Sequence, residues 1–183
     1  MRRLTAVAAT ALACALPLGC GDAGTVEGPP PAAPATLRLT SAGFADGQTI
    51  PRRFTCAGRE VSPPLAWDGV PARARALALV LEDPDAPGGT FVHWTVFDIP
   101  RGVSGLRAGQ VPAGAREGEN SSGERGYRGP CPPEKDRPHR YVFLVYALRS
   151  ALGLDAGAPP ADVRAAIGRA AIARGQLTGR FGR

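Results

Sequence analysis

The stretch HRYVFLVYAL, residues 139–148, is the most strand-like part of the chain and decides its fold class. β-Branched and aromatic side chains dominate it, and these favour the pleated, half-buried surface of a sheet. Two more apolar runs of strand length, residues 76–81 and 91–99, are each followed by a turn that contains proline. Apolar runs of this length between such turns indicate strands rather than buried helices.

The rest of the chain adds shorter extended segments and one helix. Residues 37–39 alternate apolar and polar side chains, and residues 62–67 are extended and stiffened by proline. After Pro159 and Pro160, apolar side chains recur on one helical face up to Gly175. We therefore predict a mainly antiparallel β domain with a short C-terminal helix.

Residues 102–138 form a long stretch with little periodicity that is dense in glycine, proline and charge. A loop of this length inside a compact domain is usually either functional or disordered. We expect functional residues in it.

The composition fits one domain whose function does not depend on general surface charge. The chain has 183 residues, of which 44% are apolar, enough for a real core. The formal net charge is +6, but the arginines are scattered rather than gathered in a run. No recognition-helix, zinc-finger or RNP-like pattern accompanies them, so we predict no nucleic-acid partner.

The first 19 residues read as a signal peptide. Arg2 and Arg3 precede an apolar stretch that ends at Leu18, and no charged stop-transfer flank follows it. The Gly19-Cys20 pair resembles a bacterial lipobox, in which the cysteine becomes the lipidated first residue. Pro17 departs from that motif, and plain secretion is the alternative. Either way, we expect an exported protein, anchored in the bacterial cell envelope if Cys20 is lipidated.

Residues 20–35 consist mostly of glycine, proline and alanine. This composition cannot bury a core, and it is typical of a tether. The folded domain is therefore expected to span residues 36–183.

Cys56 and Cys131 are the cysteines of that domain. An even pair in an oxidising compartment can form a disulfide, but spacing alone also allows two buried thiols. C-x2-C pairs are absent, so we predict no metal site.

Four motifs carry the chemistry of the chain. The first is DPDAP at residues 83–87, and the second is FVHW at residues 91–94. The third is the glycine- and proline-rich segment 118–133, and the fourth is HRY at residues 139–141. Both histidines of the chain, His93 and His139, lie in these motifs at the starts of predicted strands.

These residue types together favour the binding of a small anion. An imidazole or a tyrosine hydroxyl can donate a hydrogen bond to an oxyanion, and an aspartate can select the tautomer of a histidine. Glycine-rich turns add backbone N–H groups in a concave arrangement that suits phosphate or carboxylate. We expect such a site between Asp83 and Tyr146.

The motifs also carry a family resemblance. DPDAP, HW, GENSSG, GYRGPCPP and HRYVFLVYAL occur in the order typical of the phosphatidylethanolamine-binding protein family. The chain resembles in particular its bacterial branch, the Raf-kinase-inhibitor-like proteins of the YbhB/YbcL type. The resemblance extends from Leu37 to Arg183 and includes SPPLAWDG and the closing GQLTGRFGR.

This resemblance implies a β-sandwich of a large and a small sheet, with a pocket for phosphate, acetate or phospholipid head groups. It also implies that Cys56 and Cys131 lie near this pocket. Asp85, Trp94 and Arg128 are expected at the rim or in structural roles. The ligand-binding residues that the motifs imply are Asp83, His93, Gly129, Pro130, His139 and Tyr141.

We therefore predict an exported anion- or head-group-binding protein that is not an enzyme and needs no cofactor. The expected partners are a small anionic ligand and, through the anchor, the membrane. One alternative is an inhibitor or scaffold that acts on an unidentified envelope protein. A less favoured alternative is a hydrolase in which Asp83 and His93 exchange protons, with Ser62, Ser121 or Cys131 as nucleophile. No nucleophile elbow supports that hydrolase.

Overall fold

The computed structural model describes residues 24–183, so the predicted signal peptide and Cys20 lie outside the described residues. The described chain folds into two antiparallel sheets, one α-helix and a short 3-10 helix (Arg52–Phe54). The small sheet has the order β1-β2-β5, with β1 Arg38–Thr40, β2 Leu65–Asp68 and β5 Gly105–Leu106. The large sheet has the order β6-β4-β3-β7-β8, with β6 Arg116–Glu117, β4 Phe91–Pro100, β3 Ala76–Asp83, β7 His139–Leu148 and β8 Ala171–Phe181.

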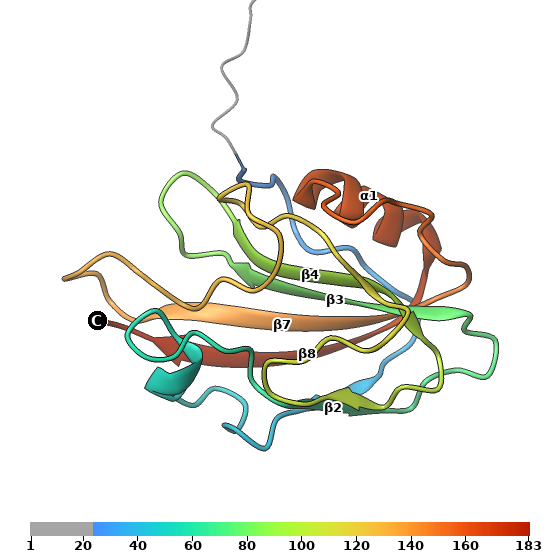
Figure 1. The fold of residues 1–183 in the computed structure, drawn as a ribbon, viewed down its shortest axis with the longest axis horizontal. Helices are drawn as coiled ribbons and strands as arrows, with labels where there is room; N and C mark the ends of the chain where they lie inside the picture. Colours follow the sequence, from blue (N-terminus) through green and yellow to red (C-terminus); the bar gives the residue numbers. More distant parts are fainter. Residues whose placement is uncertain (1–23) are drawn as a thin grey trace, which may run out of the picture.

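The molecule has three layers, with the large sheet in the middle (Figure 1). One core fills the space between the two sheets and includes Trp94, Phe143 and Leu177. A second core lies between the large sheet and helix α1 (Pro160–Ala170), where Val163 and Ile167 are buried. All eight residues of β3 are buried, because both faces of this central strand are covered. The predicted β-sandwich with a short C-terminal helix is confirmed.

The C-terminal helix ends earlier than the sequence indicated. We predicted helical periodicity up to Gly175, but α1 ends at Ala170 and the chain continues directly as β8. β8 pairs with β7 along its length, from Ala171 opposite Leu148 to Phe181 opposite His139. Ladder hydrogen bonds to a distant strand override the local helical pattern here.

Residues 24–35 belong to the tether that we predicted from composition, but in the structure they pack against the domain. Val26 is buried, and its N–H donates to the carbonyl of Thr90 at 3.0 Å. Buried Arg164 donates hydrogen bonds to backbone carbonyls of this segment. The composition of residues 24–35 does not predict this packing, because these residues contact the domain mostly through their backbone and not through their side chains. Within residues 24–183, no helix combines the length and hydropathy needed to cross a bilayer.

Candidate functional site

A cleft of about 230 Å³ opens where β3 ends and β4 and β7 begin. Three strands that are neighbours in the large sheet therefore bring their polar ends together. The cleft is lined by Asp83, Ala86, Pro87, Phe91, His93, Arg128, Cys131, Pro132, Pro133 and His139.

A β-bulge positions His93. In the pairing of β3 with β4, Leu81 lies opposite Trp94 and Glu82 lies opposite Val92, so His93 has no partner across the ladder. A bulge adds one residue and re-aims the side chains around it, which is common beside binding sites. Here it allows His93 to line the cleft while Trp94 remains in the core between the sheets.

Asp83 and His139 form a buried pair at one side of the cleft. Nδ1 of His139 lies 2.8 Å from Oδ2 of Asp83, and both side chains are 4% exposed. Oδ1 of Asp83 accepts the backbone N–H of Asp85 at 2.9 Å. Burial raises the pKa of Asp83, and the hydrogen bond from His139 partly offsets this effect. The carboxylate therefore lies beside the cleft with His139 as its hydrogen-bond partner.

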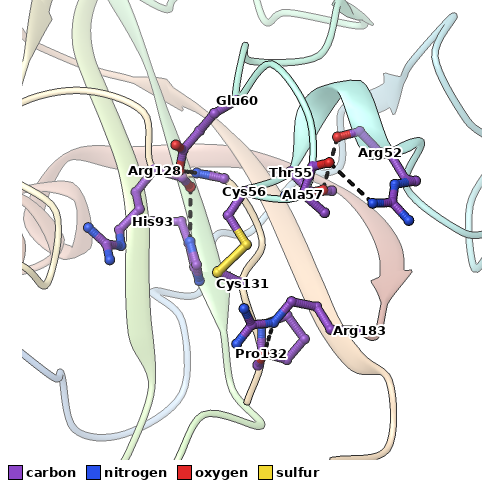
Figure 2. Close-up of a disulfide and its surroundings, with 11 residues drawn as sticks. Arg52, Thr55, Cys56, Ala57, Glu60, His93, Arg128, Cys131, Pro132 and Arg183 are labelled. Atoms are coloured by element: carbon purple, nitrogen blue, oxygen red, sulfur yellow. Dashed lines mark hydrogen bonds between the residues drawn. A yellow bond between two sulfur atoms is a disulfide. The ribbon is translucent and has the colours of Figure 1, made fainter. Parts of the chain in front are cut away.

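The loop residue Arg128 fixes the tautomer of His93 (Figure 2). Nδ1 of His93 lies 2.9 Å from the carbonyl oxygen of Arg128, so Nδ1 carries the proton and donates. The backbone N–H of Arg128 in turn donates to the carbonyl of His93 at 2.9 Å. Burial lowers the pKa of His93 to about 4. At neutral pH, Nε2 of His93 is therefore an unprotonated hydrogen-bond acceptor.

Tyr141 packs against this histidine. Its ring meets the ring of His93 edge-on, with centroids 5.3 Å apart. The hydroxyl is fully buried and has no hydrogen-bond partner among residues 24–183. Burial raises the pKa of Tyr141, and the charge of Asp83 adds to this effect, so the hydroxyl stays protonated and is a potential donor.

An ion pair holds the DPDAP turn. Oδ1 of Asp85 is 2.7 Å from an Nη of Arg140, and Oδ2 accepts both the Nε–H and the backbone N–H of Arg140. These bonds lower the pKa of Asp85 to about 2. Asp85 thus joins the turn after β3 to the start of β7, and it does not line the cleft.

A disulfide holds the loop of residues 128–133, which lines part of the cleft. Cys56 and Cys131 are bonded, with Cα atoms 5.5 Å apart, and Cys131 lines the cleft (Figure 2). The backbone N–H of Cys56 donates to the carbonyl of Pro130 at 3.2 Å. The pairing that the sequence left open is therefore a disulfide, and it joins the segment after the 3-10 helix to the loop that carries Arg128.

Three residues that the motifs implied as ligands, Gly129, Pro130 and Tyr141, do not line the cleft. The N–H of Gly129 donates to Oε1 of Glu60 at 3.0 Å, and a Cβ at this glycine would press on the backbone of Thr55 and Cys56. Pro130 is buried. Trp94, which was expected at the rim or in a structural role, donates from Nε1 to Glu117 at 2.7 Å within the core.

Sequence reasoning placed no ligand contact on Phe91 or on the prolines that line the cleft, Pro87, Pro132 and Pro133. The motifs DPDAP and GPCPP contain these prolines, and their rigid turns were the available signal. Across the described part of the chain, no three His, Cys, Asp or Glu side chains gather in a group that could hold a metal ion.

Comparisons with known proteins agree on one family. The sequence profile described as "Phosphatidylethanolamine-binding protein" matches residues 40–182. A "UPF0098 protein" of Methanothermobacter thermautotrophicus is 44% identical over 152 residues, which cover 80% of this chain and 99% of the relative. "Putative lipoprotein LppC" of Mycobacterium tuberculosis is 42% identical over 193 aligned positions, with 97% of this chain and 96% of the relative covered. Crystalline YbcL of E. coli, described as a new member of the mammalian PEBP family, superimposes with a TM-score of 0.78 at 32% identity, covering 81% of this chain and 99% of that one.

Proposed function

Because this chain belongs to the phosphatidylethanolamine-binding protein family, we propose that its cleft binds a small anionic group and does not chemically change it. The ligand is a phosphate or carboxylate, free or as part of a phospholipid head group. The observation that carries this proposal is the meeting of Asp83, His93 and His139 from three strands at one cleft.

The candidate nucleophiles are all occupied, which supports binding without turnover. Cys131 is in the disulfide, and the hydroxyl of Ser121 is bonded to the backbone of Gly24 and Val92. Ser62 is buried away from the cleft, where its hydroxyl accepts the N–H of Gly109 at 3.1 Å. A hydrolase that forms a covalent intermediate would need one of them free and within reach of a general base.

Replacement of His93 by alanine is expected to weaken the binding of inorganic phosphate by roughly 10- to 150-fold, because a hydrogen bond to a charged group contributes about 1.5–3 kcal/mol. Isothermal titration calorimetry of the purified wild-type and variant proteins with phosphate measures this difference. Arg125→Gln is the matched control, since Arg125 is exposed in the same loop but does not line the cleft.

Unchanged phosphate affinity in His93→Ala would contradict the placement of the ligand in this cleft. Hydrolysis of a chromogenic phosphoester or carboxylic ester by the wild-type protein, lost in His93→Ala, would instead show that the cleft is catalytic.

Arg128 contributes a positive charge to the cleft, whereas buried Asp83 and His93 favour an anion that binds together with a proton. A second negative charge beside the buried carboxylate of Asp83 is repelled. Neutral His93 presents only a lone pair to the cleft, so it cannot donate to a fully ionised anion. The ligand therefore either brings its own acidic proton, as a phosphate monoanion does, or takes one up from solution.

Sulfate separates these two cases, because it carries no proton near neutral pH. We expect its affinity to rise as the pH falls from 7 to 5, by up to about tenfold per pH unit for one proton taken up. The sign follows from the pKa of His93, about 4 in the free protein, which a bound anion raises. Protonation of Asp83, whose pKa is raised by burial, acts in the same direction.

Calorimetry with sulfate at several pH values, in buffers of different ionisation enthalpy, measures both the affinity and the proton uptake. His93→Gln is the informative control, because its amide donates without protonation and should flatten the dependence. An affinity that is constant or increases with pH would contradict proton-coupled binding.

The proposal includes export and attachment through a lipid on Cys20. Two observations support it: the disulfide is typical of an oxidising compartment, and the relative named as a lipoprotein aligns with 97% of this chain. Mass spectrometry of the protein purified from bacterial membranes tests it, because acylation adds a defined mass to an N-terminal Cys20.

A further inference from the structure

The N-terminal strap, residues 24–35, is held by a buried arginine of helix α1. The guanidinium of Arg164 donates to the carbonyls of Glu27, Gly28 and Pro29 at 3.1, 3.1 and 2.8 Å. Its Nε lies 3.0 Å from Oε1 of Glu82, and the two side chains are 8% and 3% exposed. The strap therefore closes over a buried ion pair and supplies acceptors that the arginine would otherwise lack.

The far end of the strap is bonded to strand β8. The backbone N–H of Arg174 donates to the carbonyl of Ala35 at 2.9 Å, and its guanidinium donates to the carbonyl of Pro31 at 3.3 Å. Figure 1 shows this segment in blue, running beside α1 from the point where the described chain begins. Two arginines from different elements thus hold the strap along its length.

The near end of the strap lies beside the cleft. The N–H of Val26 bonds to the carbonyl of Thr90, and the carbonyl of Gly24 accepts the hydroxyl of Ser121. Thr90 is followed directly by Phe91, which lines the cleft. The chain therefore leaves the domain toward its N-terminus at the edge of the cleft.

We propose that the strap presents the cleft to the membrane, so that the anionic group it binds is the phosphate of a lipid head group in the bilayer that holds the anchor. This inference rests on the proposed lipid at Cys20.

The length of chain between the lipid anchor at Cys20 and the first residue bonded to the domain determines which face can lie near the membrane. Three residues lie between Cys20 and Gly24, so the four steps of chain from one to the other span at most about 14 Å. If residues 20–35 were a free tether, the sixteen residues from Cys20 to Thr36 could span about 55 Å. A domain of this size is about 40 Å across. The longer reach would let any face turn to the membrane, whereas the shorter one keeps the face around Gly24 and Thr90 close to the head groups.

The test uses the full-length lipidated protein in vesicles of phosphatidylethanolamine and phosphatidylglycerol that contain a nitroxide-labelled head-group lipid. A fluorophore is attached at Ala86→Cys in the wall of the cleft, or at Arg101→Cys in the exposed turn after β4. β4 has ten residues, which places this turn about 33 Å from Phe91. We expect quenching to be several-fold stronger at position 86 than at position 101.

Two further variants separate the role of the strap from that of the anchor. A flexible Gly/Ser insertion of about twelve residues between Ala23 and Gly24 lengthens the reach without altering the described domain. It should reduce quenching at position 86 several-fold, toward the value at position 101. Arg164→Gln should also reduce quenching at position 86, because it releases the strap. If that variant does not fold, the insertion alone tests whether the strap orients the domain.

Equal quenching at the two positions, or quenching at position 86 that the insertion leaves unchanged, would overturn the orientation. The absence of an acyl mass on Cys20 would overturn it together with the proposed anchor. Phosphate binding by the protein in detergent, measured by calorimetry, reports on the cleft alone. Its loss would therefore count against the proposed function and not against the orientation.

Discussion

An Arg164→Gln variant is expected to lose about 3–5 kcal/mol of unfolding free energy, because it removes the ion-pair partner of buried Glu82 and leaves only the charge of Arg174 acting on that carboxylate. Glu82 is 2% exposed and would be left in the core. The strap would also lose the hydrogen bonds that Arg164 donates to its carbonyls. Urea unfolding followed by circular dichroism measures the change.

Three comparisons make this experiment specific. Arg169→Gln changes an exposed arginine of the same helix and should alter stability by no more than about 0.5 kcal/mol. Glu82→Gln combined with Arg164→Gln should be less destabilised than the sum of the single variants, because no charge is then left unpaired. The loss in Arg164→Gln should also shrink at low pH, since burial raises the pKa of Glu82 and its protonated form needs no counter-charge. A loss as small as that of Arg169→Gln would contradict the role of the pair.

Removal of the disulfide, by Cys56→Ser with Cys131→Ser, is expected to have a similarly large effect. The bond closes a loop with a sequence separation of 75 residues, and its loss costs about 4 kcal/mol on the chain-entropy account. Phosphate affinity should fall as well, because the bond holds the loop whose Arg128 carbonyl orients His93. Urea unfolding and calorimetry measure the two effects.

The matched control is treatment with a reductant. It should destabilise the wild-type protein by about as much as the double substitution does, and it should leave the double variant unchanged. Equal stability of the oxidised and reduced wild-type protein would contradict a structural role for this disulfide. Loss of stability without loss of phosphate affinity would show that the cleft keeps its shape without the bond.

The sequence predicted the central part of the fold because local and tertiary preferences agree there. β3, β4 and β7 are apolar along most of their length and end at proline- or glycine-containing turns, so their burial only strengthens what the residues already favour. Because these strands could be predicted, the sequence also showed which polar motifs lie at their ends. Asp83, His93 and His139 fall at the ends of neighbouring strands, and the antiparallel order of the sheet brings these ends together.

Where local preference and tertiary contact disagree, the sequence misled. Alanine-rich residues 171–175 continue a helical pattern, yet ladder bonds to β7 make them a strand. Gly175 and Gly179 lie in that strand where a Cβ would collide with Leu37 and Ile50, and neither of these residues is near them in the sequence.

The sequence by itself therefore determined the sheet, its central strands and the residue types of the anion site. Only the tertiary structure decided that residues 24–35 are a strap, that His93 lies in a bulge, and that Gly129, Pro130 and Tyr141 do not line the cleft. The physical reason is the same in each case. These features depend on hydrogen bonds and close contacts with residues far away in the sequence, as the bonds of Arg164 to the strap and of Gly129 to Glu60 show, and no local pattern records such partners.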